Sequence, residues 1–273
     1  MRLDSHVHFW RYDASEYGWI DATMSRIQRD FLPADASREM RQAGVDACVA
    51  VQVRQTLEET RWLLALADEY PFIAGVVGWV DLRSSDLDTQ LESLDHPKLV
   101  GVRHIVQAEA DDFLMDDRFR KGVARLARHE LAYDVLIYAR QLPAAIDFAS
   151  ALPDVRLVLD HLGKPDIKRG GFDGWRRDLD RMAALPNAFA KLSGLVTEAD
   201  WNRWTIDDLQ RYVRAALESF GPERLMIGSD WPVCTLVAGY RQVLDIVRTA
   251  IDERPPNEQD AILGGTARRF WNL

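Results

Sequence analysis

The chain has 273 residues, 47% of them hydrophobic, which is enough for one large core. Its formal net charge of -9 argues against a nucleic-acid partner, because phosphate binding requires basic patches. No run of about 18 apolar residues suggests a membrane span, and no charged segment followed by an apolar run suggests a secretion signal. The two cysteines, Cys48 and Cys234, are too few for a disulfide framework, so we expect a cytoplasmic protein.

Short segments rich in Val, Ile, Leu and aromatic residues alternate with longer helical segments from one end of the chain to the other. Several of the short segments are nearly continuous apolar runs, which is typical of strands that are covered on both faces. In chain order the predicted strands are Arg2–Phe9, Ala47–Val53, Phe72–Val80, Val100–Val106, Tyr133–Tyr138, Arg156–His161, Ala188–Ser193 and Leu225–Ser229.

Between the strands, apolar residues recur at helical spacing, and Pro or Gly marks many of the segment ends. The segment Glu58–Glu69, for example, carries Trp62, Leu63 and Leu66 on one face and stops before Pro71. The predicted helices are Ala36–Ala43, Glu58–Glu69, Arg118–His129, Pro143–Ala151, Trp175–Leu185, Ile206–Phe220 and Gly239–Asp252.

Eight strands that are each followed by helical material indicate a parallel α/β architecture. At this chain length the pattern favours a (β/α)8 TIM barrel formed by residues 1–273 as a single domain. A doubly wound open sheet is the alternative, and it is disfavoured because no Gly-rich phosphate loop follows the first strand. The long aromatic and charged segment Arg11–Pro33 is expected to be an elaborated loop that covers a site.

His6 and His8 lie one residue apart at the end of the first predicted strand. Side chains alternate between the two faces of a strand, so both imidazoles are expected to point the same way, and Asp4 shares their parity. Two imidazoles on one face can chelate a metal ion or polarise a carbonyl group. Taken alone, the pair is better explained by two exposed histidines on an N-terminal extension.

Other polar residues also follow predicted strands. Arg103 and His104 lie near the end of the fourth strand, His161 closes the sixth and Asp230 closes the eighth. Each position has a simpler explanation: a core histidine at 104, a hydrogen bond from His161 to its neighbour Asp160, a helix cap at Asp230. Because catalytic groups of a barrel project from the carboxyl ends of several strands, their joint placement favours one active site.

The order of short motifs along the chain resembles that of the amidohydrolase superfamily. Within it, the chain is similar to the amidohydrolase-2 group of sugar-lactone hydrolases, the L-fuconolactonase and L-rhamnonolactonase type. The matching runs are Asp4-Ser-His-Val-His-Phe-Trp10, Gly78-Trp-Val-Asp-Leu82, Gly101-Val-Arg-His104, Asp160-His-Leu-Gly-Lys-Pro165, Lys191-Leu-Ser-Gly194 and Gly228-Ser-Asp-Trp-Pro-Val233. The resemblance implies a (β/α)8 barrel that hydrolyses a lactone derived from a sugar.

The chain departs from the wider superfamily at the positions that hold a second metal. No lysine ends the fourth or fifth strand, and the fifth strand ends in Leu136-Ile-Tyr138 without a histidine. The resemblance therefore implies at most one divalent metal, with zinc expected, held by His6, His8 and Asp230. The alternative is hydrolysis without metal, in which His6, His8 and His161 act as electrophiles.

Lactone hydrolysis needs an activated water, a polarised carbonyl and a proton for the departing ring oxygen. We assign Asp230 as the general base that also returns the proton, with His6, His8 and His161 as the polarising groups. Arg103 and His104 are expected to face the substrate, Trp10 to stack on the sugar ring, and Gln52 and Arg54 to bind its hydroxyls.

Two other functions stay open at this point. The same barrel supports metal-dependent decarboxylation of an aromatic or dienoic acid, which would keep the site and change its chemistry. A non-catalytic sugar-binding barrel is the second, and it leaves the carboxylate beside the imidazoles unexplained. The expected partner is a small-molecule sugar lactone. The sequence leaves open the identity of the sugar, assembly into a homo-oligomer and any role for Cys234, which lies close to Asp230 in the chain.

Overall fold

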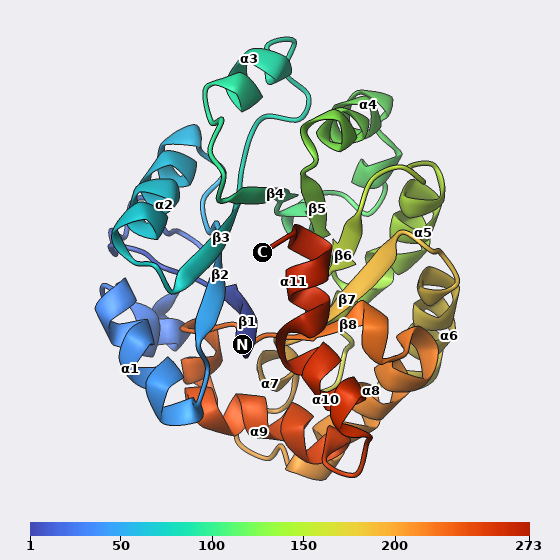
Figure 1. Cartoon of the computed structure of the whole chain (residues 1–273). Coiled ribbons are helices and arrows are strands. Elements are labelled where there is room, and N and C mark those ends of the chain that lie inside the picture. The colour runs from blue at the N-terminus through green and yellow to red at the C-terminus, as the bar shows by residue number, and fades with distance from the viewer.

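Eight parallel strands, each hydrogen-bonded to the next in chain order, form the centre of the computed structural model, which describes residues 1–273. The strands are β1 (Leu3–Val7), β2 (Ala47–Val51), β3 (Ile73–Gly78), β4 (Leu99–His104), β5 (Ala132–Val135), β6 (Leu157–Leu159), β7 (Ala188–Leu192) and β8 (Leu225–Ile227). The ring closes where Trp231 pairs with Val7 and the amide of Asp230 donates to the carbonyl of His6 at 2.9 Å. The predicted (β/α)8 barrel is confirmed (Figure 1).

Helices surround the strands on the outside of the barrel (Figure 1). Their bounds are α1 (Pro33–Ala43), α2 (Leu57–Glu69), α3 (Leu87–Glu92), α4 (Asp117–Arg125), α5 (Leu142–Ser150), α6 (Phe172–Ala183), α7 (Leu195–Glu198), α8 (Ile206–Phe220), α9 (Tyr240–Ile251), α10 (Pro256–Asp260) and α11 (Thr266–Trp271). Hydroxyl caps fix two of the starts, because Thr56 accepts from the amide of Glu59 and Thr205 forms a capping box with Asp208. The predicted helices are present, whereas α3, α7, α10 and α11 were not predicted.

Every strand ends one to three residues before the end of its predicted range, and the fifth and sixth show why. The fifth was predicted to reach Tyr138 and ends at Val135, and the sixth was predicted to reach His161 and ends at Leu159. Leu136, Ile137 and Asp160, beyond these strands, stay buried but leave the hydrogen-bonded ladder, and Asp160–Gly163 forms a tight turn instead. An apolar run therefore predicts burial more reliably than it predicts strand length.

The end of the barrel at the amino termini of the strands is sealed by α11, which lies across the centre of the ring in Figure 1. Its Phe270 and Trp271 are buried in a cluster with strand side chains that include Leu3 and Met226. The ring centroid of Phe270 lies 4.7 Å from that of Phe189 on β7. Apolar side chains fill this end, and the buried ammonium of Lys191 lies next to them, 5.2 Å from the ring centroid of Trp271.

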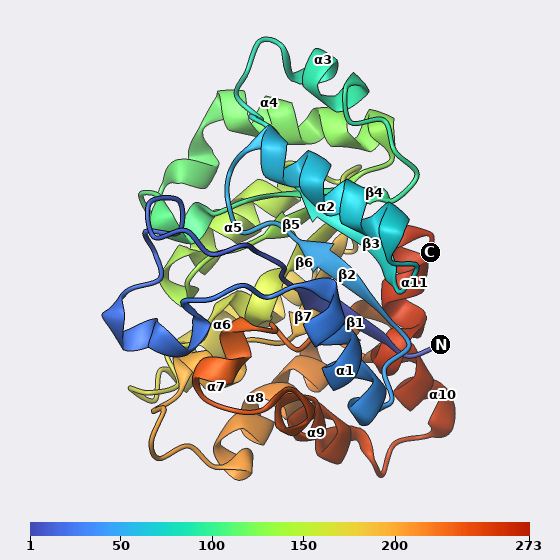
Figure 2. The same cartoon turned by 90° about the vertical axis from the view of Figure 1, so that its left-hand side faces the viewer.

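The segment between β1 and α1 extends over the opposite end of the barrel (Figure 2). Trp10 and Phe31 exchange backbone hydrogen bonds of 3.0 and 2.9 Å, which brings the two ends of the segment together. Glu16, inside the segment, forms an ion pair with Arg54, which follows β2. The predicted loop thus lies over the carboxyl ends of the strands and is tied to them.

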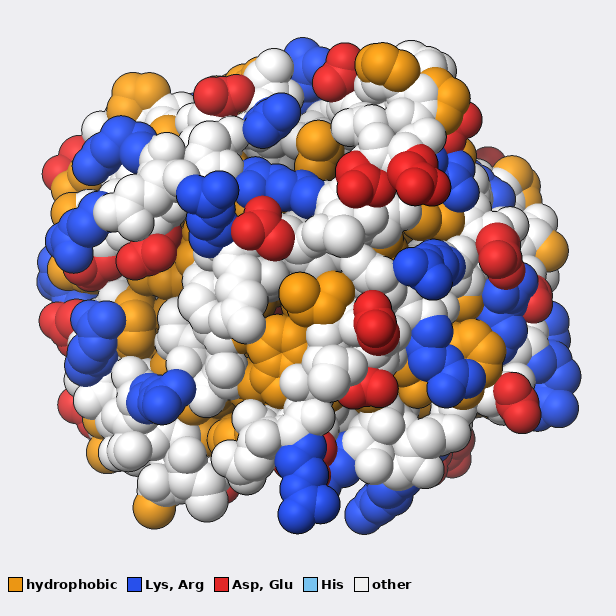
Figure 3. All heavy atoms as spheres, turned by 90° about the horizontal axis from the view of Figure 1, so that it is seen from below, with side chains coloured by type: hydrophobic (Ala, Val, Ile, Leu, Met, Phe, Trp, Pro, Cys, Tyr) orange, Lys and Arg blue, Asp and Glu red, His pale blue; other side chains and the backbone are white.

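Charged side chains of both signs are interspersed over the surface shown in Figure 3, with small apolar areas between them. None of the helices combines the length and the hydropathy that a membrane crossing requires.

The plug formed by α11 yields a prediction about stability. We expect Phe270→Ala to lower the free energy of unfolding by about 3–5 kcal/mol, because it removes a buried ring and leaves a cavity. The exposed neighbour Arg268 has no side-chain hydrogen bond or ion pair, so Arg268→Ala should change stability by less than about 0.5 kcal/mol. Urea unfolding of the two variants measures the difference, and equal stabilities would show that α11 does not contribute to the core.

Glu59, in the first turn of α2, holds the loop that follows β2. One of its carboxylate oxygens accepts from the amides of Val53 and Arg54 at 3.1 and 2.6 Å, and only 1% of the residue is exposed. Burial raises the pKa of this carboxyl from its ordinary 4.5 to about 7, against the opposing effect of the two amides. The folded protein therefore retains a proton on Glu59 at pH values where the unfolded chain has lost it.

This difference predicts how stability depends on pH. Between pH 4.5 and 7 the folded state binds a proton on Glu59 that the unfolded chain does not bind. The contribution of this proton to the free energy of unfolding is therefore fully present below pH 4.5 and is lost as the pH rises to 7. The loss is on the order of 3 kcal/mol. The glutamine of Glu59→Gln does not titrate. As the pH is raised from 5 to 8, the free energy of unfolding of this variant should therefore increase relative to that of wild type. Parallel pH profiles for the two proteins, measured by urea unfolding, would contradict this prediction.

Candidate active site

His6 and His8 point into the carboxyl end of the barrel from β1 and the residue that follows it. Nδ1 of His8 donates to the carbonyl of Val51 at 2.7 Å, which leaves the lone pair of Nε2 facing the site. Nε2 of His6 lies 3.2 Å from Nε2 of His8, so the two imidazoles converge as predicted. Both side chains are buried.

Asp4 does not share the face of the two histidines, and that expectation was wrong. The pairing of β1 with β2 shifts register between Asp4 and Val7, so the strict alternation of side chains is interrupted there. One carboxylate oxygen of Asp4 accepts from the hydroxyl of Tyr240 on the outer helix α9, and the other accepts from the amide of Ser229. Asp4 therefore fastens β1 to the outer layer and to the segment before Asp230.

Asp230 places one carboxylate oxygen among three imidazoles. Oδ1 lies 3.3 Å from Nε2 of His8, 3.8 Å from Nε2 of His161 and 3.9 Å from Nε2 of His6. The structure thus brings together all four residues that the sequence nominated for catalysis. They come from the ends of β1, β6 and β8, the end of a barrel where active sites form.

The backbone around the site is held in an unusual conformation. Asp230 and His161 have φ angles of 59° and 54°, in the left-handed region that side chains other than glycine rarely adopt. Leu162 and Lys164 are also left-handed, with φ of 52° and 47°. Such strain clusters at functional sites, where the surrounding structure enforces it. It is an indication of function that is independent of residue type.

Ser193 and Gly194, after β7, position His161. The hydroxyl of Ser193 is hydrogen-bonded to Nδ1 of His161 at 2.8 Å. A Cβ atom at position 194 would lie 2.5 Å from Cγ of His161, and the φ of Gly194 is +66°. Only glycine meets both requirements. Sequence reasoning missed both residues as site components, although they stand in one of the motifs it singled out.

The charge states in the site are set by burial and by the neighbouring groups. Burial lowers the pKa of His161 to about 4, and burial together with nearby Lys191 lowers the pKa of His6 well below its ordinary value. Burial alone would raise the pKa of Asp230, yet His161 and His8 keep it below its ordinary range. At neutral pH the site therefore holds an ionised carboxylate beside the neutral imidazoles of His6 and His161.

Beneath His6 lies a buried group of four charged side chains, the ionic cluster Arg103, Asp134, Asp160 and Lys191. Nη1 of Arg103 lies 3.0 Å from Oδ2 of Asp160, and Nζ of Lys191 lies 2.9 Å from Oδ1 of the same carboxylate. Lys191 also pairs with Asp134. Sequence reasoning missed the two aspartates and the lysine, and the available signal was a charged residue inside each of three otherwise apolar strand segments.

The predicted substrate residues lie in different surroundings. Arg103 points into the barrel, and the side-chain amide of Gln52 donates to its carbonyl at 3.0 Å, which links the ends of β2 and β4. Arg54 is paired with Glu16 and lies over the ring of Tyr17. These three therefore lie at the mouth or just below it, and their contact with substrate stays a prediction.

Two further predicted substrate residues turn away from the imidazoles. Trp10 has no exposed surface, packs edge-on against Phe31 and donates from its indole nitrogen to the carbonyl of Arg29 at 2.9 Å. His104 lies on the face of β4 opposite Arg103 and stacks on Phe113 at a centroid distance of 5.0 Å. In this structure neither ring presents a free face for stacking on a sugar.

The donors in the site fit a divalent metal. His6, His161 and Asp230 offer ligand atoms that all lie within 4.8 Å of one another, and Nε2 of His8 lies 3.3 Å from Oδ1 of Asp230. Imidazole nitrogens with one carboxylate are a donor set that zinc commonly takes, with an open position for water or substrate. Nδ1 of each histidine also has a buried hydrogen-bonding neighbour, as ligating histidines require.

Two residues at the rim also face Asp230. Nζ of Lys164 lies 3.6 Å from a carboxylate oxygen of Glu198, at the end of α7. Burial raises the pKa of Glu198, with Lys164 opposing the shift. Lys164 also contributes to the low pKa of Asp230, so its positive charge reaches the centre of the site.

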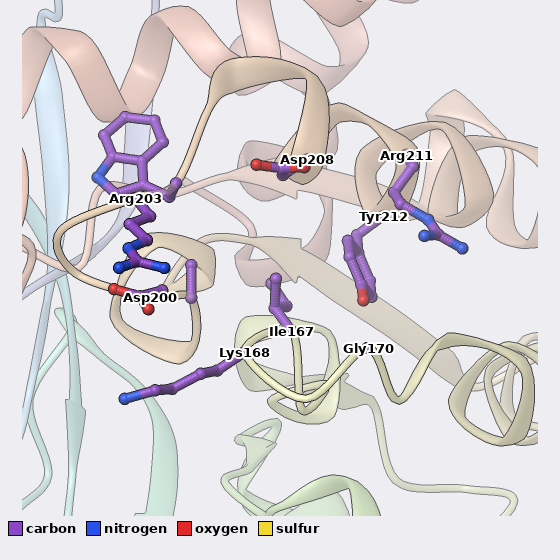
Figure 4. Close-up of a pocket in the computed structure, with 10 residues that line it drawn as sticks. Ile167, Lys168, Gly170, Asp200, Arg203, Asp208, Arg211 and Tyr212 are labelled. Atoms are coloured by element: carbon purple, nitrogen blue, oxygen red, sulfur yellow. The ribbon is translucent and has the colours of Figure 1, made fainter.

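A separate surface cavity of about 340 Å³ lies between α8 and the turn at Ile167–Gly170. Three cations line it, but Figure 4 shows Lys168, Arg203 and Arg211 pointing in different directions. Arg203 extends toward Asp200, and Arg211 extends away from the cavity. The side chains do not converge, so this cavity is not a second candidate site.

Comparison with known proteins agrees with this geometry. The family model described as amidohydrolase matches residues 3–273. The L-fucono-1,5-lactonase of Burkholderia multivorans is 44% identical over 285 residues, which covers 100% of this chain and 96% of that protein. The L-fucono-1,5-lactonase of Burkholderia ambifaria is 38% identical, with 100% and 96% covered.

Among solved structures, the chain is similar to an amidohydrolase from Burkholderia multivorans crystallised with bound zinc. The two share 44% identity with a TM-score of 0.97, and the match covers 100% of this chain and 99% of that one. Both the sequence match and the structural match extend over the whole barrel, including the strand ends that carry the imidazoles and Asp230. This chain therefore belongs to the amidohydrolase family.

Proposed function

We propose that this chain hydrolyses a lactone derived from a sugar, an aldonolactone similar to L-fuconolactone, to the open sugar acid. The observation that carries the proposal is the ionised carboxylate of Asp230 among three imidazoles at the mouth of the barrel. The two L-fucono-1,5-lactonases, at 44% and 38% identity over the whole chain, support the choice of substrate class.

Asp230 acts as the general base. Its carboxylate stays ionised at neutral pH, so it can take a proton from the attacking water. The imidazoles of His6 and His161 are neutral, so neither is a fixed cation that would prevent Asp230 from holding the proton. The same carboxyl then delivers that proton to the ring oxygen as the carbon–oxygen bond breaks.

The imidazoles provide the electrophilic side of the site. His6 and His161 can donate from Nε2 to the carbonyl oxygen where negative charge develops, whereas His8, whose Nδ1 carries the proton, can act there only as a metal ligand. Burial of the three rings keeps bulk water away, which strengthens each electrostatic contact. Ser193 and Gly194 hold His161, and the carbonyl of Val51 holds His8, so neither ring has to reorganise during the reaction.

We propose one divalent metal, zinc, with His6, His8 and Asp230 as its ligands and His161 beside them. When bound, the ion supplies Lewis acidity toward the carbonyl and lowers the pKa of a water to about 7. The zinc in the related amidohydrolase supports this choice. We further propose that the protein works in the cytoplasm, because Cys48 and Cys234 are both buried and unpaired, as expected in a reducing compartment.

We expect Asp230→Asn to retain the fold and to lower kcat by about 10²–10⁴-fold with little change in KM, because the amide has nearly the same shape and cannot act as a base. A pH-indicator assay with L-fucono-1,5-lactone, corrected for spontaneous hydrolysis, measures the effect. Asp154→Asn, which removes an exposed carboxylate, is the control and should match wild type. A rate for Asp230→Asn near that of wild type would show that another group is the base.

Removal of metal gives a separate test. We expect exhaustive dialysis against a strong chelator to lower kcat by more than about 10²-fold, and one equivalent of zinc to restore it, because the donor set suits one ion. Metal content per chain is measured alongside the rate by elemental analysis. Full activity in a metal-free sample would contradict the proposed metal requirement and leave the imidazoles as the only electrophiles.

A further inference from the structure

Two turns lie side by side at the mouth of the barrel, next to the imidazoles. The turn after β6 carries His161 and Lys164, and the segment after β7 carries Gly194 and Glu198. Gly194 lies directly against the ring of His161. A few residues further along, the amide of Lys168 donates to the carbonyl of Glu198 at 3.1 Å, which ties the two turns together again. The turns that position an active-site imidazole therefore also position Lys164 and Glu198.

The side chain of Lys164 has a defined position. Its backbone amide donates to the carbonyl of His161 at 2.9 Å, within the left-handed turn described above. Its Nζ lies 5.5 Å from the ring centroid of Tyr138, which follows β5, and only 15% of the side chain is exposed. Ordering a long lysine side chain costs conformational entropy, so this placement at the mouth of the barrel requires a compensating interaction.

The partner of Lys164 in the structure is Glu198, and the two groups do not form a good hydrogen bond. Nζ lies 3.6 Å from Oε1, whereas a well-formed N–H···O bond spans about 2.7–3.2 Å. Neither side chain has another hydrogen bond or ion pair. An ammonium group donates and a carboxylate accepts, so a hydroxyl group placed beside the pair can accept from Lys164 and donate to Glu198 at once.

Fold stability does not explain why this pair is present. The two side chains are 15% and 18% exposed, so both charges are largely removed from water. The cost of desolvating two charges offsets most of their attraction, and such pairs add little net stability. Burial raises the pKa of Glu198 in spite of Lys164, which shows that the ion pair does not fully compensate the carboxylate for its loss of water. A polar ligand that completes these hydrogen bonds would be favoured here.

The pair lies close enough to Asp230 for their charges to interact. In addition to the effects of burial and of the imidazoles, Lys164 lowers the pKa of Asp230, and Asp230 adds to the burial that raises the pKa of Glu198. In the proposed reaction Asp230 activates the water that attacks the lactone carbonyl, so the carbonyl carbon, C1, lies near Asp230. The hydroxyl group nearest to C1 in an aldonolactone is the one on C2.

We propose that Lys164 and Glu198 bind the hydroxyl group on C2 of the sugar lactone, with Lys164 donating to its oxygen and Glu198 accepting its hydrogen. The two residues would then select lactones that carry a hydroxyl next to the carbonyl, and they would hold that carbonyl in register with Asp230. The inference rests on the proposed hydrolysis of a sugar lactone and names two residues that recognise its substrate.

The test compares two substrates: the fastest lactone of an aldonolactone panel that includes L-fuconolactone, and the 2-deoxy analogue of that lactone. We expect wild type to favour the hydroxylated lactone by about 10–100-fold in kcat/KM, because the analogue loses hydrogen bonds to charged groups. In Lys164→Met and in Glu198→Met the preference should fall by at least about 5-fold, since each variant removes one of the two contacts. Lys168→Met removes an exposed lysine from the same turn and should keep the preference of wild type.

The preference is a ratio of two rates measured on one sample, so it does not depend on how much of a variant is folded. It also cancels any effect of the lost charge on Asp230, which acts on both lactones. A merely structural ion pair would slow both lactones alike and leave the ratio unchanged. Wild-type ratios in both methionine variants at positions 164 and 198 would therefore overturn the proposal.

The wild-type enzyme separates failure of this inference from failure of the proposed function. If it hydrolyses aldonolactones and their 2-deoxy analogues equally well, lactone hydrolysis stands and the role of Lys164 and Glu198 is overturned. If it hydrolyses no sugar lactone, both proposals fail.

Discussion

The carboxylate of Asp160 is fully buried at the centre of the barrel, and the arrangement of the site depends on the two cations that hold it there. Arg103 reaches it from β4 and Lys191 from β7, so a single carboxylate ties together strands on different sides of the ring. Removing one partner of a buried pair leaves an uncompensated charge and typically costs about 3–5 kcal/mol. All three side chains are therefore fixed in place, and His6 rests on them.

The same constraint explains how two carboxylates in one barrel have different properties. Burial alone would raise the pKa of Asp160, but Lys191 and His6 hold it well below its ordinary range, and its permanent cationic partners leave no place for a proton. Asp230 faces the imidazoles of His6 and His161, which burial keeps neutral. It is ionised yet able to accept a proton, which is what a general base requires. The difference between the two carboxylates lies in their partners, since both are equally buried.

Much of this arrangement could be predicted from sequence. Strands covered on both faces have nearly continuous apolar sequences, and a barrel brings their carboxyl ends together. His6, His8, His161 and Asp230 were found in this way. The ionic cluster was not, since a lone charge such as Lys191 in an apolar run has no visible partner until the strands are arranged in space. Trp10 could not be placed either, because it lies beyond the end of β1, where strand alternation no longer gives the direction of a side chain. His104 could have been separated from Arg103, since neighbouring residues of a strand point to opposite faces.

The left-handed turn that carries His161 also bears on how this protein can evolve. Leu162 and Lys164 adopt backbone conformations that glycine or asparagine would tolerate better, and each such residue holds about 1–3 kcal/mol of strain. Selection for heat resistance alone would favour replacement of Lys164 by one of those residues. The same replacement would remove the cation near Asp230. Variants of this turn that gain thermal stability should therefore lose activity.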